Sequence, residues 1–312
     1  MMSALVNQQN NKLIVLILRV ATFCVFFGRA WQHLLWDAPY RSFFWDQALM
    51  EPIVTSIGNL TWKAYATSAN TDFLIQSLIK FNGFIYLICA FVAILITKHH
   101  KKLGKVLWLG TGLLVILSLL YYKTKFYKIG QFIEYSCQMS APIFLYIILF
   151  YEVNRKRLNF ALKVAIALTF IGHGFYAIGW YARPGHFVDM AMNSLHFIKI
   201  PISQDQTINL LYWAGVADMI VAAAIFLPKK WALPFLTWAF VWGGLTTFAR
   251  IVSYMYVDAN FHTFLQWTPQ TVMRMPHLLI PLVSIVLIMG WQTISYRKSK
   301  VVKDHSNSVA IS

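Results

Sequence analysis

The chain contains 312 residues, of which 58% are hydrophobic and 12% are charged, and its formal net charge is +16. Soluble globular proteins typically carry about 25% charged residues. This composition therefore excludes a soluble protein and indicates an integral membrane protein, whose main partner is the lipid bilayer. The basic residues lie in short segments beside apolar runs and form no separate basic domain, which excludes nucleic acid as a partner.

Apolar runs recur along the whole chain and approach the length of about 20 residues that a helix needs to cross a hydrocarbon core. We expect spanning helices at residues 13–36, 76–97, 106–122, 132–152, 159–182, 208–227, 231–253 and 273–295. The YYKTKFYK segment after the short third run is interpreted as an interfacial extension with tyrosine and lysine anchors. The sequence thus predicts an all-α integral membrane protein with eight transmembrane helices.

Three cysteines, Cys24, Cys89 and Cys137, each lie inside an apolar run, and no CxxC pair occurs. This pattern predicts neither a disulfide framework nor a zinc site. We interpret all three as small apolar packing residues, and we expect no metal site.

Lysine and arginine predict the orientation, because cytoplasmic loops of membrane proteins are enriched in them. If both termini share one side, the basic segments 98–105, 154–157, 228–230 and 296–303 all fall on that side. The less basic and more aromatic loops 37–75, 183–207 and 254–272 then fall on the other side. We expect both termini in the cytoplasm and a bacterial cytoplasmic membrane as the location. Lys123, Lys125 and Lys128 are an exception, because they fall on the outer side.

Two apolar segments of the chain match each other: LRVATFCVFFGRAWQHLLW, residues 18–36, and LKVAIALTFIGHGFYAIGW, residues 162–180. Later spans repeat the same order of features. The matched positions are Leu18/Leu162, Val20/Val164, Ala21/Ala165, Phe26/Phe170, Gly28/Gly172, Trp36/Trp180, Gly83/Gly215 and Pro142/Pro281. Because each unit contains an even number of spans, both copies have the same orientation in the membrane. We expect two parallel-repeat four-helix bundles, residues 1–153 and 154–312.

The second half carries a recognisable helix pattern. LKVAIALTFIGHGFYAIGW is followed by a second helix, LLYWAGVADMIVAAAIFL, and by a basic turn into a third helix. This unit resembles the DoxX-like membrane family, whose members are four-helix bundles and include the small subunit of thiosulfate:quinone oxidoreductase. The family often has an acidic residue and a glycine early in the second helix, which Asp218 and Gly215 match and Tyr86 and Gly83 of the first half match less well. The resemblance implies a quinone- or redox-linked membrane component.

Eight ionisable side chains lie within the expected spans, where a central charge costs about 2.5–3.5 kcal/mol on insertion scales. They are Arg29, His33, Glu134, His173, Asp218, Arg250, Arg274 and His277. At a rise of about 1.5 Å per residue, nearly all fall in the outer third of the membrane, and Asp218 falls near its middle. Arg29 and His33 are four residues apart and share one helix face. We expect the eight groups to line one outward-facing polar cavity in which His173 pairs with Asp218.

Simpler interpretations remain open for individual members of this set. The side chains of Arg250 and Arg274 can extend to the outer interface, and Glu134 can be solvated there. A lone histidine on an apolar helix face is more often a hydrogen-bonded packing residue than a chemical one. Asp218 is harder to explain in this way, because a carboxyl group near the middle of the membrane must be protonated or paired.

No P-loop, dinucleotide-binding fingerprint, HExxH pair, CxxCH haem site or nucleophile elbow occurs in the sequence, so the sequence leaves open whether the protein is an enzyme. No cofactor is evident from the sequence. The first hypothesis is a redox component that interacts with quinone or with a partner oxidoreductase, in which Arg29, Arg250 or Arg274 holds an oxyanion and Asp218 and His173 handle protons. The second is a carrier or channel for a small anionic or polar solute. The third is a scaffold that binds a membrane or periplasmic protein through its aromatic outer loops.

Overall fold

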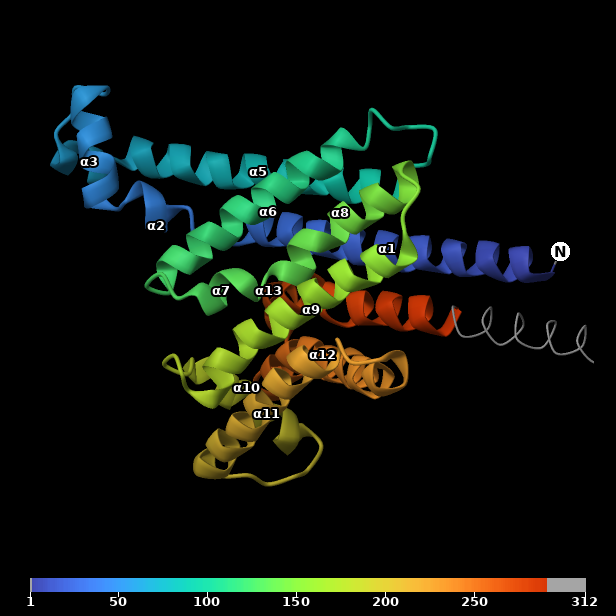
Figure 1. Cartoon of the computed structure of the whole chain (residues 1–312). Helices are drawn as coiled ribbons and strands as arrows, with labels where there is room; N and C mark the ends of the chain where they lie inside the picture. The colour runs from blue at the N-terminus through green and yellow to red at the C-terminus, as the bar shows by residue number, and fades with distance from the viewer. Residues whose placement is uncertain (1, 291–312) are drawn as a thin grey trace, which may run out of the picture.

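The described part of the chain, residues 2–290 of the computed structural model, is built from helices and contains no strand. Eight of its segments are long and apolar enough to cross a membrane, which confirms the expected all-α membrane architecture (Figure 1). The predicted basic tail and the last residues of the predicted eighth span lie outside the described residues.

Six spans are single helices, and two are each divided into two helices. The single helices are α1 (Met2–Leu35), α5 (Ala69–Leu95), α6 (Lys105–Thr124), α9 (Arg155–Ile178), α11 (Gln204–Ala224) and α12 (Lys229–Val257). The divided spans are α7 (Ile129–Ile133) with α8 (Ser136–Phe150), and α13 (Phe261–Val272) with a helix at 276–290. Four short helices lie between spans: α2 (Arg41–Phe44), α3 (Gln47–Ser56), α4 (Trp62–Ala66) and α10 (Gly185–Phe197).

Helix starts lie earlier than the apolar pattern predicts, because polar caps begin several helices before their apolar stretch. The Ser68 hydroxyl accepts a hydrogen bond from the backbone N–H of Thr71 and starts α5 seven residues before the expected position 76. Ser203 and Gln206 form a reciprocal capping box at the start of α11. Such caps satisfy backbone donors that have no partner inside the helix. At the other end of α9, Gly179 adopts a φ of 95°, which a side chain would disfavour.

The fourth and eighth spans are interrupted by a turn at corresponding points. In the fourth span, Glu134 and Tyr135 separate α7 from α8, and in the eighth span residues 273–275 separate α13 from the last helix. A break within a membrane span is tolerated where the backbone is buried in protein or lines a water-filled cavity. These turns therefore mark places where polar groups can lie inside the bundle.

Glycines matched between the halves make matched contacts. A Cβ on Gly28 of α1 would lie 2.6 Å from the backbone nitrogen of Met273, and one on Gly172 of α9 would lie 2.7 Å from that of Glu134. Each of these helices therefore packs directly on the break in the last span of the opposite half. Only glycine permits such a close approach of two backbones.

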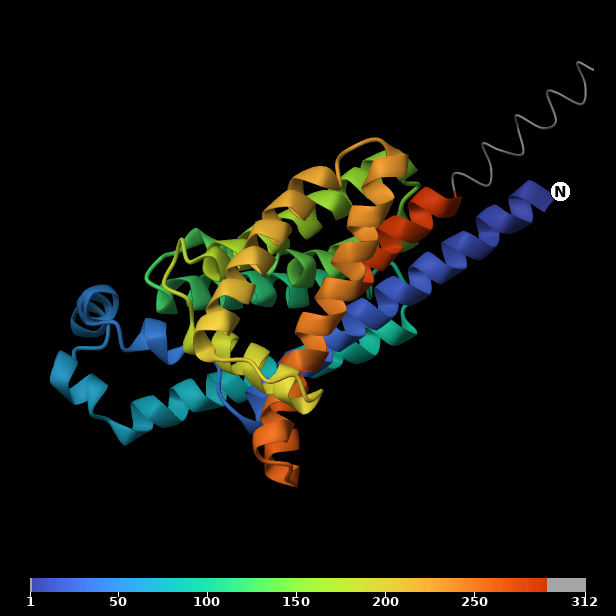
Figure 2. The ribbon, with the colours of Figure 1, turned by 90° about the horizontal axis from the view of Figure 1, so that it is seen from below.

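The second pair of matched glycines behaves in the same way. Gly83 of α5 packs against His33 and Leu34 of α1, whereas Gly215 of α11 packs against Ala177 and Ile178 of α9. The views in Figures 1 and 2 show α5 running alongside α1, and contacts join α9 to α11. The first two spans of each half are therefore packed as a pair.

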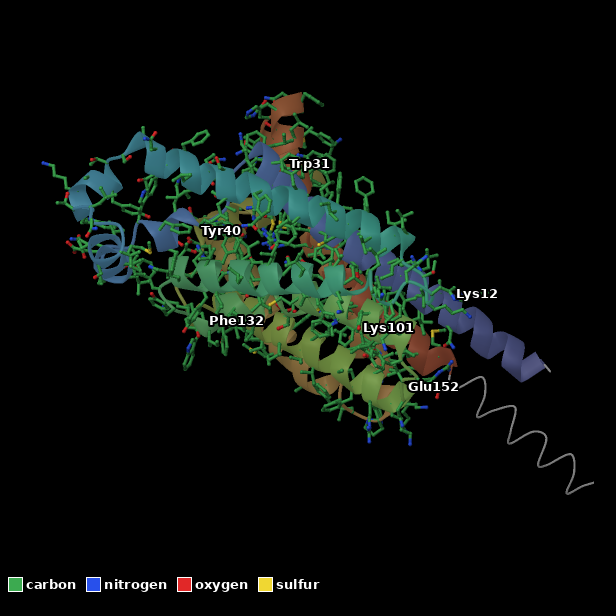
Figure 3. All side chains as sticks on the ribbon, turned by 90° about the horizontal axis from the view of Figure 1, so that it is seen from above. Lys12, Trp31, Tyr40, Lys101, Phe132 and Glu152 are labelled. Atoms are coloured by element: carbon green, nitrogen blue, oxygen red, sulfur yellow. The ribbon has the colours of Figure 1, made fainter. Side chains whose placement is uncertain are left out.

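The two ends of the bundle differ in their charged residues. Figure 3 places Lys12, Lys101 and Glu152 toward the end where the N-terminus lies, and Tyr40 and Phe132 toward the opposite end. The three lysines that broke the expected charge pattern lie in the last turn of α6 and just after it, near that opposite end. The three lysines have different structural roles, and these roles account for lysines at this end of the bundle.

Lys123 forms an ion pair with Asp46, and the hydrogen bond from its ammonium group lowers the pKa of the Asp46 carboxyl. The Lys128 ammonium lies 4.8 Å from the centre of the Tyr181 ring, close enough for a cation–π contact. Lys125 lines a polar cavity. The ion pair of Lys123 offsets its charge, so a count of basic residues overstates the free positive charge at this end.

Candidate functional site

The break in each divided span brings ionisable side chains into the interior. Glu134 lies at the break of the fourth span, Arg274 lies at that of the eighth, and His277 follows in the last helix. The carbonyl of Arg274 is within 3.0 Å of His277 Nδ1 and accepts a 3.4 Å hydrogen bond from Thr247 Oγ1. His277 Nε2 lies 3.4 Å from the carbonyl of Glu134. The two breaks are thus joined through His277.

Glu134 and Arg274 border a cavity of about 320 Å³, which we call the cationic chamber. It lies between the α6–α7 turn, the break of the fourth span, the start of α10, the end of α12, and α13 with the break that follows it. Its polar or ionisable lining residues are Tyr121, Lys125, Gln131, Glu134, Tyr135, Tyr176, His186, Arg250, Tyr254, Trp267, Gln270 and Arg274. A volume of about 300 Å³ or more is typical of pockets that hold small molecules.

Positive charge exceeds negative charge in the cationic chamber. Lys125, Arg250 and Arg274 face a single carboxylate, that of Glu134. Arg250 and Arg274 are each 9% exposed, so bulk water solvates them poorly. A buried charge is costly unless it is paired and hydrogen-bonded. The chamber is therefore suited to an anionic ligand.

Neither guanidinium has a carboxylate partner within the described residues. No carboxylate oxygen lies within 4.0 Å of Arg250 or Arg274. The Nε atoms of both are buried without a hydrogen-bond partner, and the Arg250 side chain forms no hydrogen bond with the described part of the chain. Arg274 donates a 2.8 Å hydrogen bond to the Gln270 side chain. The guanidinium groups thus keep unused donors beside the chamber.

Glu134 is oriented by other neighbours. Gln131 donates a 2.7 Å hydrogen bond to one of its oxygens, and His173 Nδ1 lies 3.8 Å from the other. The His173 ring in turn lies 5.5 Å from the ring of His277, centre to centre. The carboxylate neighbour of His173 is therefore Glu134, and no hydrogen bond joins His173 to Asp218 among the described residues, contrary to the expected pair.

His186 lies at the edge of the chamber, where loss of hydration and the positive charges of the chamber both affect its imidazole. It lies in α10, outside the spanning helices, and its side chain is exposed. Even so, the surrounding protein removes water from the imidazole, and the positive charges of Arg250, Arg274 and Lys125 add to this effect, so that its pKa falls to about 4. Loss of hydration and neighbouring positive charge both lower a histidine pKa below its ordinary value of about 6.5.

A smaller pocket of about 70 Å³, here called the inner pocket, adjoins the cationic chamber. The two share Phe187, Arg250 and Arg274 as lining residues. The inner pocket also contains His173, Asp218, Trp242 and His277. A space of this size holds about two water molecules.

Asp218 is 4% exposed and faces this pocket instead of the lipid. Its Oδ1 atom is buried without a hydrogen-bond partner, and Trp242 lines the same pocket. A buried polar atom without a partner is unusual and calls for a ligand, a water molecule or a functional reason.

Arg29 and His33 do not line the chamber or the inner pocket. Arg29 donates hydrogen bonds of 2.9 Å to Gln32 and 2.8 Å to Gln138, and its guanidinium lies 5.1 Å from the centre of the Tyr135 ring. His33 packs among aromatic rings, 5.1 Å from that of Tyr86. These two residues form a separate polar cluster inside the first half, whereas the other six candidates lie at the chamber or the inner pocket.

Sequence reasoning did not single out Lys125 or His186 as site residues. Lys125 carried a signal, because it was one of the three lysines on the wrong side for the basic-residue rule. His186 carried none, since it lies in a loop of unremarkable composition. Among residues 2–290, no three His, Cys, Asp or Glu side chains are grouped so as to hold a metal ion.

No protein-family model, curated protein or solved structure matches this chain. The site must therefore be interpreted from its own geometry and charge.

Proposed function

We propose that this membrane protein binds an anionic ligand in the cationic chamber. The proposal rests on one observation: two buried guanidinium groups face a cavity of about 320 Å³, and no carboxylate of residues 2–290 lies within 4.0 Å of either. Hydrogen bonds between arginine and an oxyanion are charge-assisted and often bidentate. A bound oxyanion would supply the negative charge and the acceptors that the protein does not.

The packing below the site favours a binding protein or carrier over an open channel. Leu162 and Ile166 precede His173 along α9, and Leu236 precedes the pocket residues of α12; all three are fully buried in the apolar core. Ile280 and Val283, beyond His277, belong to the same core. An ion passing these residues would lose its hydration without gaining a polar partner, so the chamber is closed toward the end of the bundle where they lie in this conformation.

We also propose that the chain is a duplicated DoxX-like four-helix unit, with halves 1–153 and 154–312. The support is the matched placement of the broken spans and the reciprocal contacts of Gly28 with Met273 and of Gly172 with Glu134. In this proposal both termini are cytoplasmic and the chamber opens outward, since the basic loops lie at the end away from it. The two copies have diverged: the position of His173 corresponds to Arg29, and that of Asp218 corresponds to Tyr86.

A quinone-linked redox role is the second candidate, and the inner pocket favours it. Asp218 keeps an unpartnered oxygen there, close to Trp242 and in the same pocket as His173. A carboxyl and an imidazole beside one pocket can exchange protons with a ligand. Quinone-dependent redox change in the purified protein, lost in Asp218→Asn, would favour this role over simple anion binding.

The main proposal is tested by binding of butyl phosphate to the detergent-solubilised protein, measured by isothermal titration calorimetry. We expect Arg250→Gln and Arg274→Gln each to weaken binding about 10- to 100-fold, since a hydrogen bond to a charged group contributes about 1.5–3 kcal/mol. Arg157→Gln, at an exposed position of α9, is the matched control and should bind normally. Equal binding by all four proteins would refute the chamber as the site.

A further inference from the structure

A third cavity, of apolar lining, opens between α10, α11 and α12. It has a volume of about 510 Å³, and we call it the lipid-side groove. Its walls include Ala191, Leu195, Leu210, Leu245 and Phe248. Leu210, Leu245 and Phe248 are all more than 40% exposed on the surface of spanning helices. The groove therefore faces the hydrocarbon of the membrane.

The lipid-side groove adjoins the polar site. Met190, Leu211, Trp242 and Thr246 line both the groove and the inner pocket. The inner pocket in turn shares Arg250, among others, with the cationic chamber. The three spaces thus lie in a row from the chamber through the inner pocket to the lipid side, a path whose lining changes from cationic to apolar along the way.

The shape of this path limits what can occupy it. The inner pocket measures about 70 Å³, so it admits a slender connecting segment but not a glycerol backbone with two chains. The chamber at one end has room for a head group, and the groove at the other has room for a hydrocarbon chain. A ligand that fills the path therefore has one chain and one head group.

The charge of the chamber specifies the head group. Three cations, Lys125, Arg250 and Arg274, face the one carboxylate of Glu134, which leaves an excess of two positive charges. A phosphate monoester carries about −1.5 to −2 charges near neutral pH and offers three acceptor oxygens. A carboxylate head group would neutralise only half of the excess. Charge balance thus favours phosphate over a fatty-acid carboxylate.

We infer that the ligand is a single-chain lipid phosphate, which reaches the cationic chamber sideways from the membrane and leaves its chain in the lipid-side groove. This inference rests on the proposed anion-binding function and adds the chain and the route. The lateral opening explains why a binding site for an anion lies next to a groove with almost no polar lining: the phosphate is held by protein while the chain stays in an apolar surrounding.

The test compares dodecyl phosphate with butyl phosphate, which has the same head group but a chain too short for the groove. Ala191→Trp fills the groove from α10, and Leu245→Trp narrows it from α12. Ala161→Trp and Leu109→Trp, at exposed positions of α9 and α6 that line none of the three cavities, are the matched controls. Binding is measured by calorimetry with protein in nanodiscs of neutral phosphatidylcholine, with dodecanoate and phosphatidic acid as comparison ligands.

We expect both groove variants to bind dodecyl phosphate at least tenfold more weakly while butyl phosphate binding is unchanged, and we expect normal binding of both ligands in the controls. Wild-type preference for dodecyl phosphate over dodecanoate and phosphatidic acid would support the single-chain phosphate. Unchanged dodecyl phosphate binding in both groove variants, or preference for either comparison ligand, would overturn this inference and leave the chamber proposal intact. Absence of butyl phosphate binding in the wild type would instead overturn the proposed function.

Discussion

Replacing Glu134 by glutamine should destabilise the protein in the absence of ligand. Glu134 is buried, and it is the one carboxylate that faces Arg250, Arg274 and Lys125 in the chamber. Two unit charges 4 Å apart attract by about 4 kcal/mol at an effective dielectric constant of 20. Since neither guanidinium lies within 4.0 Å of the carboxylate, each attraction is weaker than that. Removing one partner of a formed buried ion pair typically costs about 3–5 kcal/mol, and because Glu134 is not paired directly with either guanidinium, we expect a smaller loss of about 1–2 kcal/mol.

The assay is unfolding by sodium dodecyl sulfate in mixed micelles, followed by circular dichroism. Glu152→Gln, at an exposed position near the N-terminal end, is the matched control and should change stability by less than about 0.5 kcal/mol. The reverse change, Arg250→Met, removes a buried cation without a carboxylate partner, so we expect it to raise stability by about 1 kcal/mol or more. If Glu134→Gln proves neutral or stabilising, the chamber does not hold an excess of buried positive charge and the reasoning fails.

Three further predictions follow from the packing, the charges and the arrangement of the loops. Gly28→Ala and Gly172→Ala each place a Cβ under 3.0 Å from the backbone of an opposing helix, so each should lower the free energy of unfolding by about 1–3 kcal/mol. Gly112→Ala, where a Cβ would meet nothing within 4 Å, should be neutral or stabilising. Equal effects at all three positions would contradict the close packing. The pKa of His186, about 4 in the folded protein, lies below its unfolded value of about 6.5, so the unfolded chain binds more protons and stability should fall from pH 6.5 to 4 and level off below. Because the side chain is exposed, we expect less than about 1 kcal/mol, measured as the difference between wild type and His186→Gln across that range. Identical pH profiles would argue against the lowered pKa of His186. Reporter fusions after residues 102 and 195 should show opposite sides of the membrane, and the same side for both would refute the topology.

The positions of the eight spans could be predicted from the sequence, because lipid requires long apolar helices regardless of what they pack against. The matched glycines could also be identified from the sequence, since Gly28 and Gly172 occupy the same position in two similar segments. Helix ends were less accurate: Ser68 and Ser203 begin their helices in polar sequence that hydropathy assigns to loops.

Which ionisable groups share a cavity was decided by the tertiary structure alone. Helical spacing puts Arg29 and His33 on one face but does not say what that face meets, and here Gln138 and Tyr135 satisfy Arg29 within the first half. The breaks that carry Glu134 and Arg274 into the interior depend on backbone packing between helices that are far apart in the chain. Hydropathy records how each residue interacts with lipid, whereas the pairing of buried charges depends on distances between helices, which no single segment of sequence contains.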